Sequence, residues 1–196
     1  MNKSLKQIIY QDYNFANYKQ YFKKCLFYPE IKIGCQWRKA QYYTRHKNLL
    51  VRLFWKQKWL WLRKKTRCQI SLNTNIAPGL KLLHDGVRVI VSGVNIGSDC
   101  MIGVNVIIGK SFIDAEQRFG RPTIGDRVYI GHNSSIIGEI KIGNDVLIAP
   151  NSFVNRDVPD HSVVIGNNII IPKQNASASY IKNMIFPSCT KELTTV

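Results

Sequence analysis

From residue 70 onward, an aliphatic residue returns every six positions, with two interruptions. The thirteen positions in this register are Ile70, Ile76, Leu82, Ile90, Ile96, Ile102, Ile108, Ile124, Ile130, Ile136, Ile142, Ile148 and Val154. A helix face repeats at about 3.6 residues and a strand face at about two, so neither explains this period as one element. Six residues fit one short strand and one tight turn, and stacked coils of three such units would bury the aliphatic positions. The pattern therefore predicts a mainly β, parallel β-helix across residues 68–173.

Two smaller regularities accompany the repeat. Glycine or alanine often follows the aliphatic residue, as in Ile96-Gly97, Ile102-Gly103 and Ile148-Ala149. Such positions fit corners where φ is positive or where two backbones come close. A small or β-branched residue often stands four positions after the aliphatic one: Thr74, Val94, Val106, Val128, Ser134, Val146 and Ser152. The alternative is chance periodicity in an ordinary β domain, and thirteen residues in near-perfect register argue against it.

The two interruptions are candidate functional loops. The step from Leu82 to Ile90 takes eight residues and contains His84-Asp85-Gly86, and the step from Ile108 to Ile124 takes sixteen. Loops held by a rigid solenoid often carry function, because the coils fix their position. Residues 174–196 are polar or mixed, and we expect a C-terminal tail that covers the last coil.

Residues 1–67 are expected to form a separate, helical N-terminal segment. Residues 47–65 interleave Lys and Arg with Leu, Trp and Phe and contain no Gly or Pro, which predicts a helix. An amphipathic, basic, Trp-rich helix can lie on an anionic membrane surface. It can equally pack its apolar residues against the first coil, which needs a cap. The two interpretations are compatible.

The charge belongs to this segment. The chain has a net charge of +16, and residues 1–67 contain 17 Lys or Arg but only Asp12 and Glu30 as acids. A basic arm attracts any polyanion, but no nucleic-acid-binding motif is present, so we expect no nucleic-acid partner. The chain has no apolar run long enough to span a membrane and no convincing secretory signal.

The compartment and the metal content follow from the cysteines and histidines. Five cysteines without a C-x-x-C pair fit a reducing environment. We therefore expect a cytoplasmic protein, with a peripheral position at the inner membrane face left open. The four histidines show no short-range ligand pair, so no metal is expected.

The segment Cys68–Lys173 resembles the serine acetyltransferase-like family of hexapeptide-repeat acyltransferases. The motifs that carry the resemblance are Leu82-Leu83-His84-Asp85-Gly86, Val106-Ile107-Ile108-Gly109, Ile124-Gly125-Asp126-Arg127-Val128-Tyr129-Ile130-Gly131, Ile148-Ala149-Pro150-Asn151-Ser152 and Asp157-Val158-Pro159. The resemblance implies a left-handed parallel β-helix, a homotrimer, and acetyl transfer from acetyl-CoA as cosubstrate to a hydroxyl group.

The family's catalytic histidine falls on His84, with the implied role of general base. Histidine suits this role because the unperturbed imidazole, with a pKa of about 6.5, is largely neutral near pH 7. The alternative is a polar histidine at a solenoid corner. The family's orienting aspartate falls on Gln69, which keeps a hydrogen-bond acceptor but not the charge. Asp85 is the other candidate for orienting His84.

The resemblance also implies an acetyl-CoA site along the coils. Gly109, Gly131, His132, Ala149 and Pro150 occupy the matching turn positions, and each is alternatively a plain solenoid corner. Cationic donors for the CoA phosphates are sought among Arg118, Arg121, Arg127 and Lys173. The family's closing G-x-P-A motif here is Gly166-Asn167-Asn168-Ile169, which departs from the pattern.

The acceptor hydroxyl is the most open part of the prediction. Arg118 and Arg121 are also candidates for acceptor binding. The family's Arg-His-Pro here is Gly120-Arg121-Pro122, and this change argues against free serine. The short basic N-terminal segment also resembles sugar O-acetyltransferases of capsule synthesis, so a surface-polysaccharide sugar is the first expectation and serine the alternative. A non-catalytic scaffold at the membrane and a γ-type carbonic anhydrase with a zinc-binding histidine triad are the rival classes.

Overall fold

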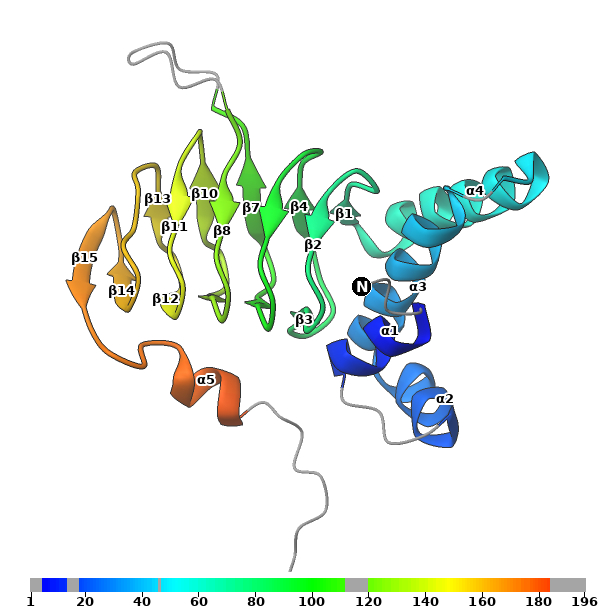
Figure 1. The fold of residues 1–196 in the computed structure, drawn as a ribbon, viewed down its shortest axis with the longest axis horizontal. Helices are drawn as coiled ribbons and strands as arrows, with labels where there is room; N and C mark the ends of the chain where they lie inside the picture. Colours follow the sequence, from blue (N-terminus) through cyan, green and yellow to red (C-terminus); the bar gives the residue numbers. More distant parts are fainter. Residues whose placement is uncertain (1–4, 14–17, 46, 112–119, 184–196) are drawn as a thin grey trace, which may run out of the picture.

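The computed structural model describes residues 5–13, 18–45, 47–111 and 120–183. A solenoid of parallel coils runs along the long axis, and a group of helices lies at its N-terminal end (Figure 1). Within the described ranges, no helix is both long enough and apolar enough to cross a bilayer.

The solenoid has three sheets, one for each side of the coil. Sheet A contains β1 (Cys68–Ile70), β4 (Arg88–Ile90), β7 (Val106–Gly109), β10 (Ser135–Ile137) and β13 (Phe153–Val154). Sheet B contains β2 (Asn75–Ile76), β5 (Asn95–Ile96), β8 (Thr123–Ile124) and β11 (Lys141–Ile142). Sheet C contains β3 (Lys81–Leu82), β6 (Met101–Ile102), β9 (Tyr129–Ile130), β12 (Val146–Ile148), β14 (Ser162–Ile165) and β15 (Ile169–Pro172). Among the described strands, all pairings are parallel except β14 with β15, which confirms the predicted parallel β-helix.

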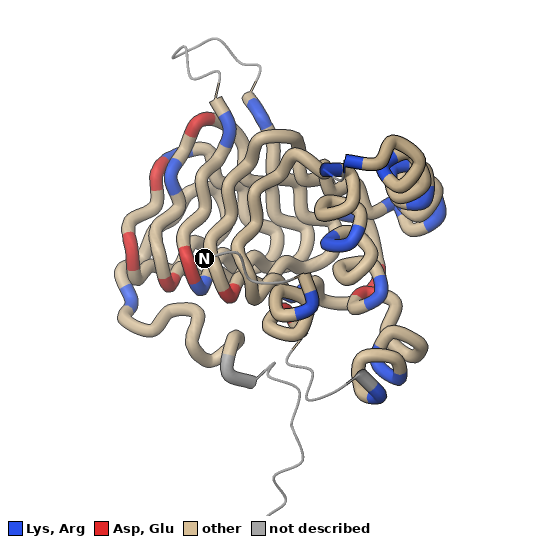
Figure 2. The backbone as a smooth tube through the Cα atoms, turned by 45° about the vertical axis from the view of Figure 1, so that its right-hand side comes forward, with Lys and Arg blue, Asp and Glu red and all other residues tan. Residues whose placement is uncertain are grey.

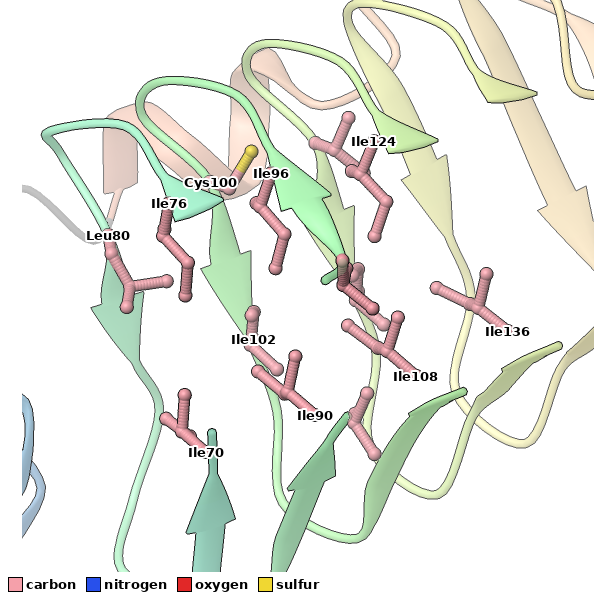
Figure 3. Packing of buried hydrophobic residues seen from close by; sticks show 14 of the residues in the cluster. Ile70, Ile76, Leu80, Ile90, Ile96, Cys100, Ile102, Ile108, Ile124 and Ile136 are labelled. Carbon is pink, nitrogen blue, oxygen red and sulfur yellow. The ribbon is translucent and has the colours of Figure 1, made fainter. Parts of the chain in front are cut away.

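The core is the aliphatic register read from the sequence. All thirteen positions are buried and belong to one hydrophobic cluster, in which isoleucines of successive coils stack in rows (Figure 3). All seven small or β-branched residues of the second series are buried as well. The structure adds members of that second series that the sequence analysis left out: Leu80, Cys100, Ile140 and Val158.

The turns between the sheets differ from the prediction in the residue that has positive φ. Positive φ does not fall on the glycine after the aliphatic residue but two positions later, at residues such as Asp99 (54°), Asn105 (55°) and Asn133 (60°). Asn and Asp tolerate this left-handed conformation better than most residues. The glycine is instead needed for close approach: a Cβ at Gly103 would lie 2.8 Å from the backbone nitrogen of His132.

The described residues of the N-terminal segment form four helices: α1 (Leu5–Tyr13), α2 (Tyr18–Phe27), α3 (Pro29–Tyr43) and α4 (Leu49–Thr66). The predicted helix over residues 47–65 is therefore confirmed as α4. Trp59 and Leu62 of α4 are buried in the solenoid core cluster. The indole nitrogen of Trp59 donates to the Ile70 carbonyl at 3.2 Å. The structure thus shows α4 capping the first coil with one of its faces.

A buried ion pair connects α1 and α3 to the first coil. Arg38 of α3 donates to both carboxylate oxygens of Asp12 in α1, at 2.8 and 3.1 Å. The same guanidinium donates to the Ile76 and Ala77 carbonyls, and Asp12 accepts from the backbone of Gly79. Burial raises the pKa of Asp12 even though Arg38 opposes the shift. The pair is a costly way to gain stability, but it fixes where the helices dock.

The C-terminal part packs along one side of the solenoid. After β15, the chain forms α5 (Ala178–Asn183). Ala176 and Ile181 contact the outer face of sheet C, where the cluster residues are Leu83, Met101, Tyr129 and Leu147. Asp145 accepts from the hydroxyl of Ser177 at 2.8 Å. The described part of the predicted tail therefore lies along several coils of sheet C and not over the last coil alone.

Candidate functional site

The coils turn from sheet C to sheet A at a column of stacked corners that carries both His84 and His132. We call this column, residues 83–87, 103–105, 131–134 and 149–152, the His84 corner. Backbone hydrogen bonds connect its layers, from Asn105 N to Val87 O, Asn133 N to Val104 O and Asn151 N to His132 O. Each turn is thus anchored to the next, which gives the side chains on it a rigid support.

His84 lies in the first turn of this column. Its φ is 57°, a conformation that few non-glycine residues adopt, and its side chain is exposed. The eight-residue step seen in the sequence places it two positions after Leu82, one earlier than the usual left-handed residue of the other corners. The centroid of its ring lies 5.6 Å from that of His132. The predicted general base therefore lies beside a second histidine, with solvent on its other side.

Arg88 is the residue that the sequence analysis missed. Its side chain is fully buried, and its guanidinium donates to the carbonyls of Leu83, His84 (2.8 Å) and Gly86 (3.2 Å). Burial lowers the pKa of Arg88, while nearby Cys68 and Asp85 oppose the shift. An arginine nevertheless stays charged in a protein. Arg88 thus holds the turn of His84 from inside the solenoid.

A signal for Arg88 exists in the sequence. It stands two positions before the register residue Ile90, and its partners in sheet A are Cys68 and Val106. In the neighbouring coils this slot holds small or β-branched residues. A long cation in a slot for small buried residues must find several acceptors, because a buried charge without them is unstable.

His132 has a defined tautomer when neutral. Its Nδ1 accepts a hydrogen bond from the Val104 backbone nitrogen at 3.0 Å, so the ring proton is on Nε2. Burial lowers the pKa of His132, and the nearby His84 and Arg88 lower it further. His132 was predicted as an acetyl-CoA contact. The structure shows it as the neighbour of His84, held by the backbone of the intervening coil.

Neither predicted partner of His84 bonds to it. Gln69 is exposed in the middle of β1, and in the described part of the chain no hydrogen bond joins it to His84. Asp85 is exposed, and its charge acts on Arg88 and Cys68. The orienting role of Gln69 or Asp85 therefore stays a prediction, while Arg88 holds the backbone of the turn that carries His84.

The predicted acetyl-CoA residues divide into two groups. Gly131, Ala149 and Pro150 lie at the His84 corner, where a Cβ on Gly131 would come within 2.5 Å of the Pro150 nitrogen. The coil stack itself therefore requires this glycine. Gly109 ends β7 at another corner, and a Cβ there would meet nothing closer than Ile137 at 3.6 Å. Packing within this chain therefore does not require a glycine at residue 109, and its role as an acetyl-CoA contact stays a prediction.

The predicted cationic residues lie away from His84. Arg121 is exposed at the corner between sheets A and B, next to Gly93. Arg127 is exposed at the corner between sheets B and C, and Lys173 donates its backbone N–H to His161 O near that corner. Arg118 lies outside the described residues. Within one chain, the candidate residues are therefore spread over all three corners.

The histidines do not form a metal site in the described ranges. There, no three His, Cys, Asp or Glu side chains are grouped in a way that could hold a metal ion. His161 belongs to another corner, where its Nδ1 lies 2.8 Å from an Asp145 oxygen. The structure therefore offers no support for the histidine triad of a γ-type carbonic anhydrase.

Comparisons with known sequences agree with this architecture. Residues 121–156 match the family described as bacterial transferase hexapeptide (six repeats). The chain is 31% identical to a Bacillus subtilis (strain 168) protein named provisionally as the acetyltransferase YvoF, over 62% of each chain. It is 38% identical to the serine acetyltransferase of Staphylococcus aureus (strain Mu50), over 51% of this chain and 49% of that one. The chain thus spans only about half to three-fifths of the length of these relatives.

Solved structures show the same fold. The soybean serine acetyltransferase apoenzyme superposes with a TM-score of 0.71 at 24% identity, over 87% of this chain and 70% of that chain. The superposed part of this chain is longer than the solenoid alone, so it also includes part of the helical N-terminal segment. Together, these comparisons confirm the resemblance to serine acetyltransferases that the sequence motifs indicate.

Proposed function

We propose that this chain, a hexapeptide-repeat β-helix protein similar to serine acetyltransferases, is an acetyl-CoA-dependent O-acetyltransferase. The observation that carries the proposal is the setting of His84. An exposed imidazole stands on a left-handed turn whose carbonyls bond to the buried Arg88, and its ring lies 5.6 Å from that of His132. Such pre-organisation of an ionisable side chain on a rigid scaffold is typical of a catalytic position.

His84 acts as general base in the proposed reaction. It takes the proton of the acceptor hydroxyl while the oxygen attacks the carbonyl carbon of the acetyl thioester. The new C–O bond forms, the C–S bond breaks, and the CoA thiolate leaves and takes up the proton from His84. General-base assistance of this kind contributes about 10²- to 10⁴-fold to a rate.

Backbone carbonyls, not a carboxylate, define the position of His84 in this proposal. Arg88 fixes the carbonyls on both sides of the histidine, so the imidazole is aimed by the backbone that carries it. Beside it, His132 is held neutral near pH 7 by the lowered pKa. A neutral neighbour does not oppose the transient positive charge on His84, whereas a protonated one would.

The distribution of the candidate residues supports assembly with other copies. His84 and Arg121 lie at different corners of the solenoid, and a site between two copies would bring these two corners together. A homotrimer would place the His84 corner of one copy against another corner of its neighbour. We propose that acetyl-CoA and the acceptor bind between copies, with Arg121, Arg127 and Lys173 contributed by a corner other than that of His84.

The acceptor is proposed to be a small hydroxyl compound, with serine as the first candidate. The relatives named serine acetyltransferase favour serine over the polysaccharide sugar that the sequence departures indicated. A sugar is the second candidate because two residues depart from the family's motifs. Gln69 stands where the family has its orienting aspartate, and Arg121 stands where it has an acceptor-binding histidine. Arg121 is exposed and can hydrogen-bond sugar hydroxyls as well as a carboxylate.

The acceptor is tested by measuring free CoA thiol and acetylated product together, with L-serine, hexoses and N-acetylhexosamines supplied in parallel. Acetylation of serine is expected. The same assay with hexoses and N-acetylhexosamines measures whether a sugar is the acceptor. Product formed from sugars alone assigns the sugar acceptor. If acetyl-CoA neither binds nor turns over with any acceptor, the enzyme proposal is overturned in favour of a non-catalytic scaffold.

A further inference from the structure

The helix α4 has a second apolar stripe that the solenoid does not cover. One stripe faces the protein: Trp59 and Leu62 are buried, and Trp55 stacks on Tyr43 with ring centroids 4.9 Å apart. Another set of large apolar residues on the same helix is more than half exposed, namely Leu49, Leu50, Leu53, Phe54 and Trp61. Capping the first coil therefore explains only one side of α4.

The exposed residues lie on one side of the helix, where half-buried Leu60 joins them and where Gln57 and Lys64 are the polar interruptions. At about 100° per residue, Leu49, Leu50, Leu53, Phe54 and Trp61 fall within an arc of about 140°. The buried stripe lies on the opposite side of the helix. Exposed apolar faces of this kind on a surface helix mark a site that another partner covers.

Cations border the exposed face on both sides. Arg52, Lys56 and Arg63 lie along one edge, and Lys58 and Lys65 along the other. The ammonium of Lys65 lies 5.3 Å from the centroid of the Trp61 ring. The helix contains no acidic residue, and its turns are marked by Lys and Arg along its length (Figure 2). The partner must therefore combine an apolar interior with negative charge.

A groove beside this face fits an anionic head group. It has a volume of about 430 Å³ and lies between α4 and the first coil. Arg45, Arg52, Lys56 and Arg63 line it together with the polar residues Ser71 and Asn73, and Leu49, Leu53 and Leu60 form its apolar edge. Phosphate oxygens suit the arginine donors, and acyl chains suit the leucines next to them.

We propose that α4 docks this protein on an anionic phospholipid surface, with Leu50, Phe54 and Trp61 inserted at the acyl boundary and the cations contacting lipid phosphates. A second copy of the chain fits less well, because two such helices would bring cations against cations without any acid to pair them. The exposed Phe22, Leu26 and Phe27 of α2, with its lysines, lie at the same end of the molecule as α4 (Figure 1). They extend the surface that can meet a membrane.

The test is co-sedimentation of the full chain with vesicles of phosphatidylcholine alone or mixed with phosphatidylglycerol. Binding is expected to the mixed vesicles only, and to weaken as NaCl rises from about 0.05 to 0.5 M. The charge variant Arg52→Gln/Lys56→Gln/Arg63→Gln should bind about 100-fold more weakly. The apolar variant Leu50→Ser/Phe54→Ser/Trp61→Ser should lose binding, and it keeps Trp59 and Leu62 so that the cap stays intact.

The matched control is Ile169→Ser/Ile171→Ser, which removes two exposed isoleucines of β15 at the opposite end of the solenoid. It should bind vesicles like the unchanged protein. Equal binding to uncharged vesicles, or wild-type binding by either α4 variant, overturns the proposal. So does a change of oligomeric mass in the apolar variant without loss of vesicle binding, which would assign the stripe to a second copy. Tighter binding to duplex DNA than to the vesicles would assign it to nucleic acid.

Discussion

At the scale of single residues, a buried cation fixes the turn that carries His84. Arg88 stands at a position of sheet A where the neighbouring coils have small residues. Its guanidinium donates hydrogen bonds to three carbonyls of the turn. Removing one partner from a buried polar cluster costs about 1–3 kcal/mol, because the remaining groups lose their hydrogen bonds without regaining water. Arg88 is thus a positioning residue whose effect on the reaction passes through His84.

Replacement of Arg88 is expected to separate turnover from binding. In Arg88→Met, kcat for acetyl transfer should fall about 10- to 100-fold, because a shift of about 1 Å in a reacting group has effects of this size. The KM for acetyl-CoA should stay within about twofold. Steady-state kinetics measure both. Arg88→Lys, which keeps the charge and part of the bonding, should recover part of kcat, whereas full kcat in Arg88→Met would remove the positioning role.

The lowered pKa of His132 predicts a pH effect on stability. Between the unfolded value near 6.5 and the lower folded value, the unfolded chain binds more protons, so stability falls as the pH falls below about 6.5. Urea unfolding at pH 7.5 and pH 5.5 measures this loss. His132→Asn has no titrating group here and should lose less stability over the same interval. An equal loss in both proteins would show that His132 does not contribute.

The sequence found His84 but not its surroundings. A break in a six-residue repeat can be recognised from the sequence alone. This break correctly placed His84 in an irregular turn. His132 comes from another coil, and the backbone of Val104 in the intervening coil holds its ring beside His84. Gln69 and Asp85 were assigned by resemblance and by closeness in sequence, and neither measure reports on which way a side chain points.

At the scale of the element, each six-residue unit carries three separate constraints. In units such as Ile102–Asn105 and Ile130–Asn133, the aliphatic residue fills the core, the glycine after it admits the next coil, and an Asn two positions later accepts the left-handed turn. The repeat alone predicts that the glycine serves both the positive φ and the close approach of the coils. The structure separates them, which explains why Asn and Asp recur in the turns.

Two glycines give a matched test of this division. Gly131→Ala should destabilise the protein by about 1–3 kcal/mol, because its Cβ would press on the Pro150 backbone at 2.5 Å. Gly109→Ala should change stability by less than about 0.5 kcal/mol, since its Cβ meets only side chains at ordinary distances. Denaturant unfolding of both variants measures the difference. Equal effects would mean that coil spacing does not restrict these corners.

At the scale of the whole molecule, the solenoid was predictable and the docking of the helices was not. A local period fixes the coil, so the fold follows from residues close in sequence. The position of the helices depends instead on long-range contacts, such as Arg38 with Ile76 and Trp59 with Ile70. The absence of Gly and Pro from residues 47–65 predicted a helix there, but it could not tell which side of α4 faces the solenoid and which stays exposed.

The spread of candidate residues over three corners predicts complementation between inactive variants. His84→Asn and Arg121→Ala should each be inactive or nearly so. When the two are mixed, unfolded and reassembled, a site between copies can receive His84 from one chain and Arg121 from the other. Random assembly should restore about a quarter of the wild-type activity. No recovery in trimers shown to be mixed by mass would place the complete site within one chain.

The central claim, that His84 is the base of an acetyl transfer, is tested most directly by comparing two corner histidines. His84 and His161 both have left-handed φ, of 57° and 55°, and asparagine tolerates this conformation. The measurement is kcat for thiol release from acetyl-CoA with the accepted hydroxyl compound. His84→Asn should lose about 10²- to 10⁴-fold and His161→Asn should stay within about threefold of wild type, with both variants folded by circular dichroism. Wild-type turnover by His84→Asn would contradict the account.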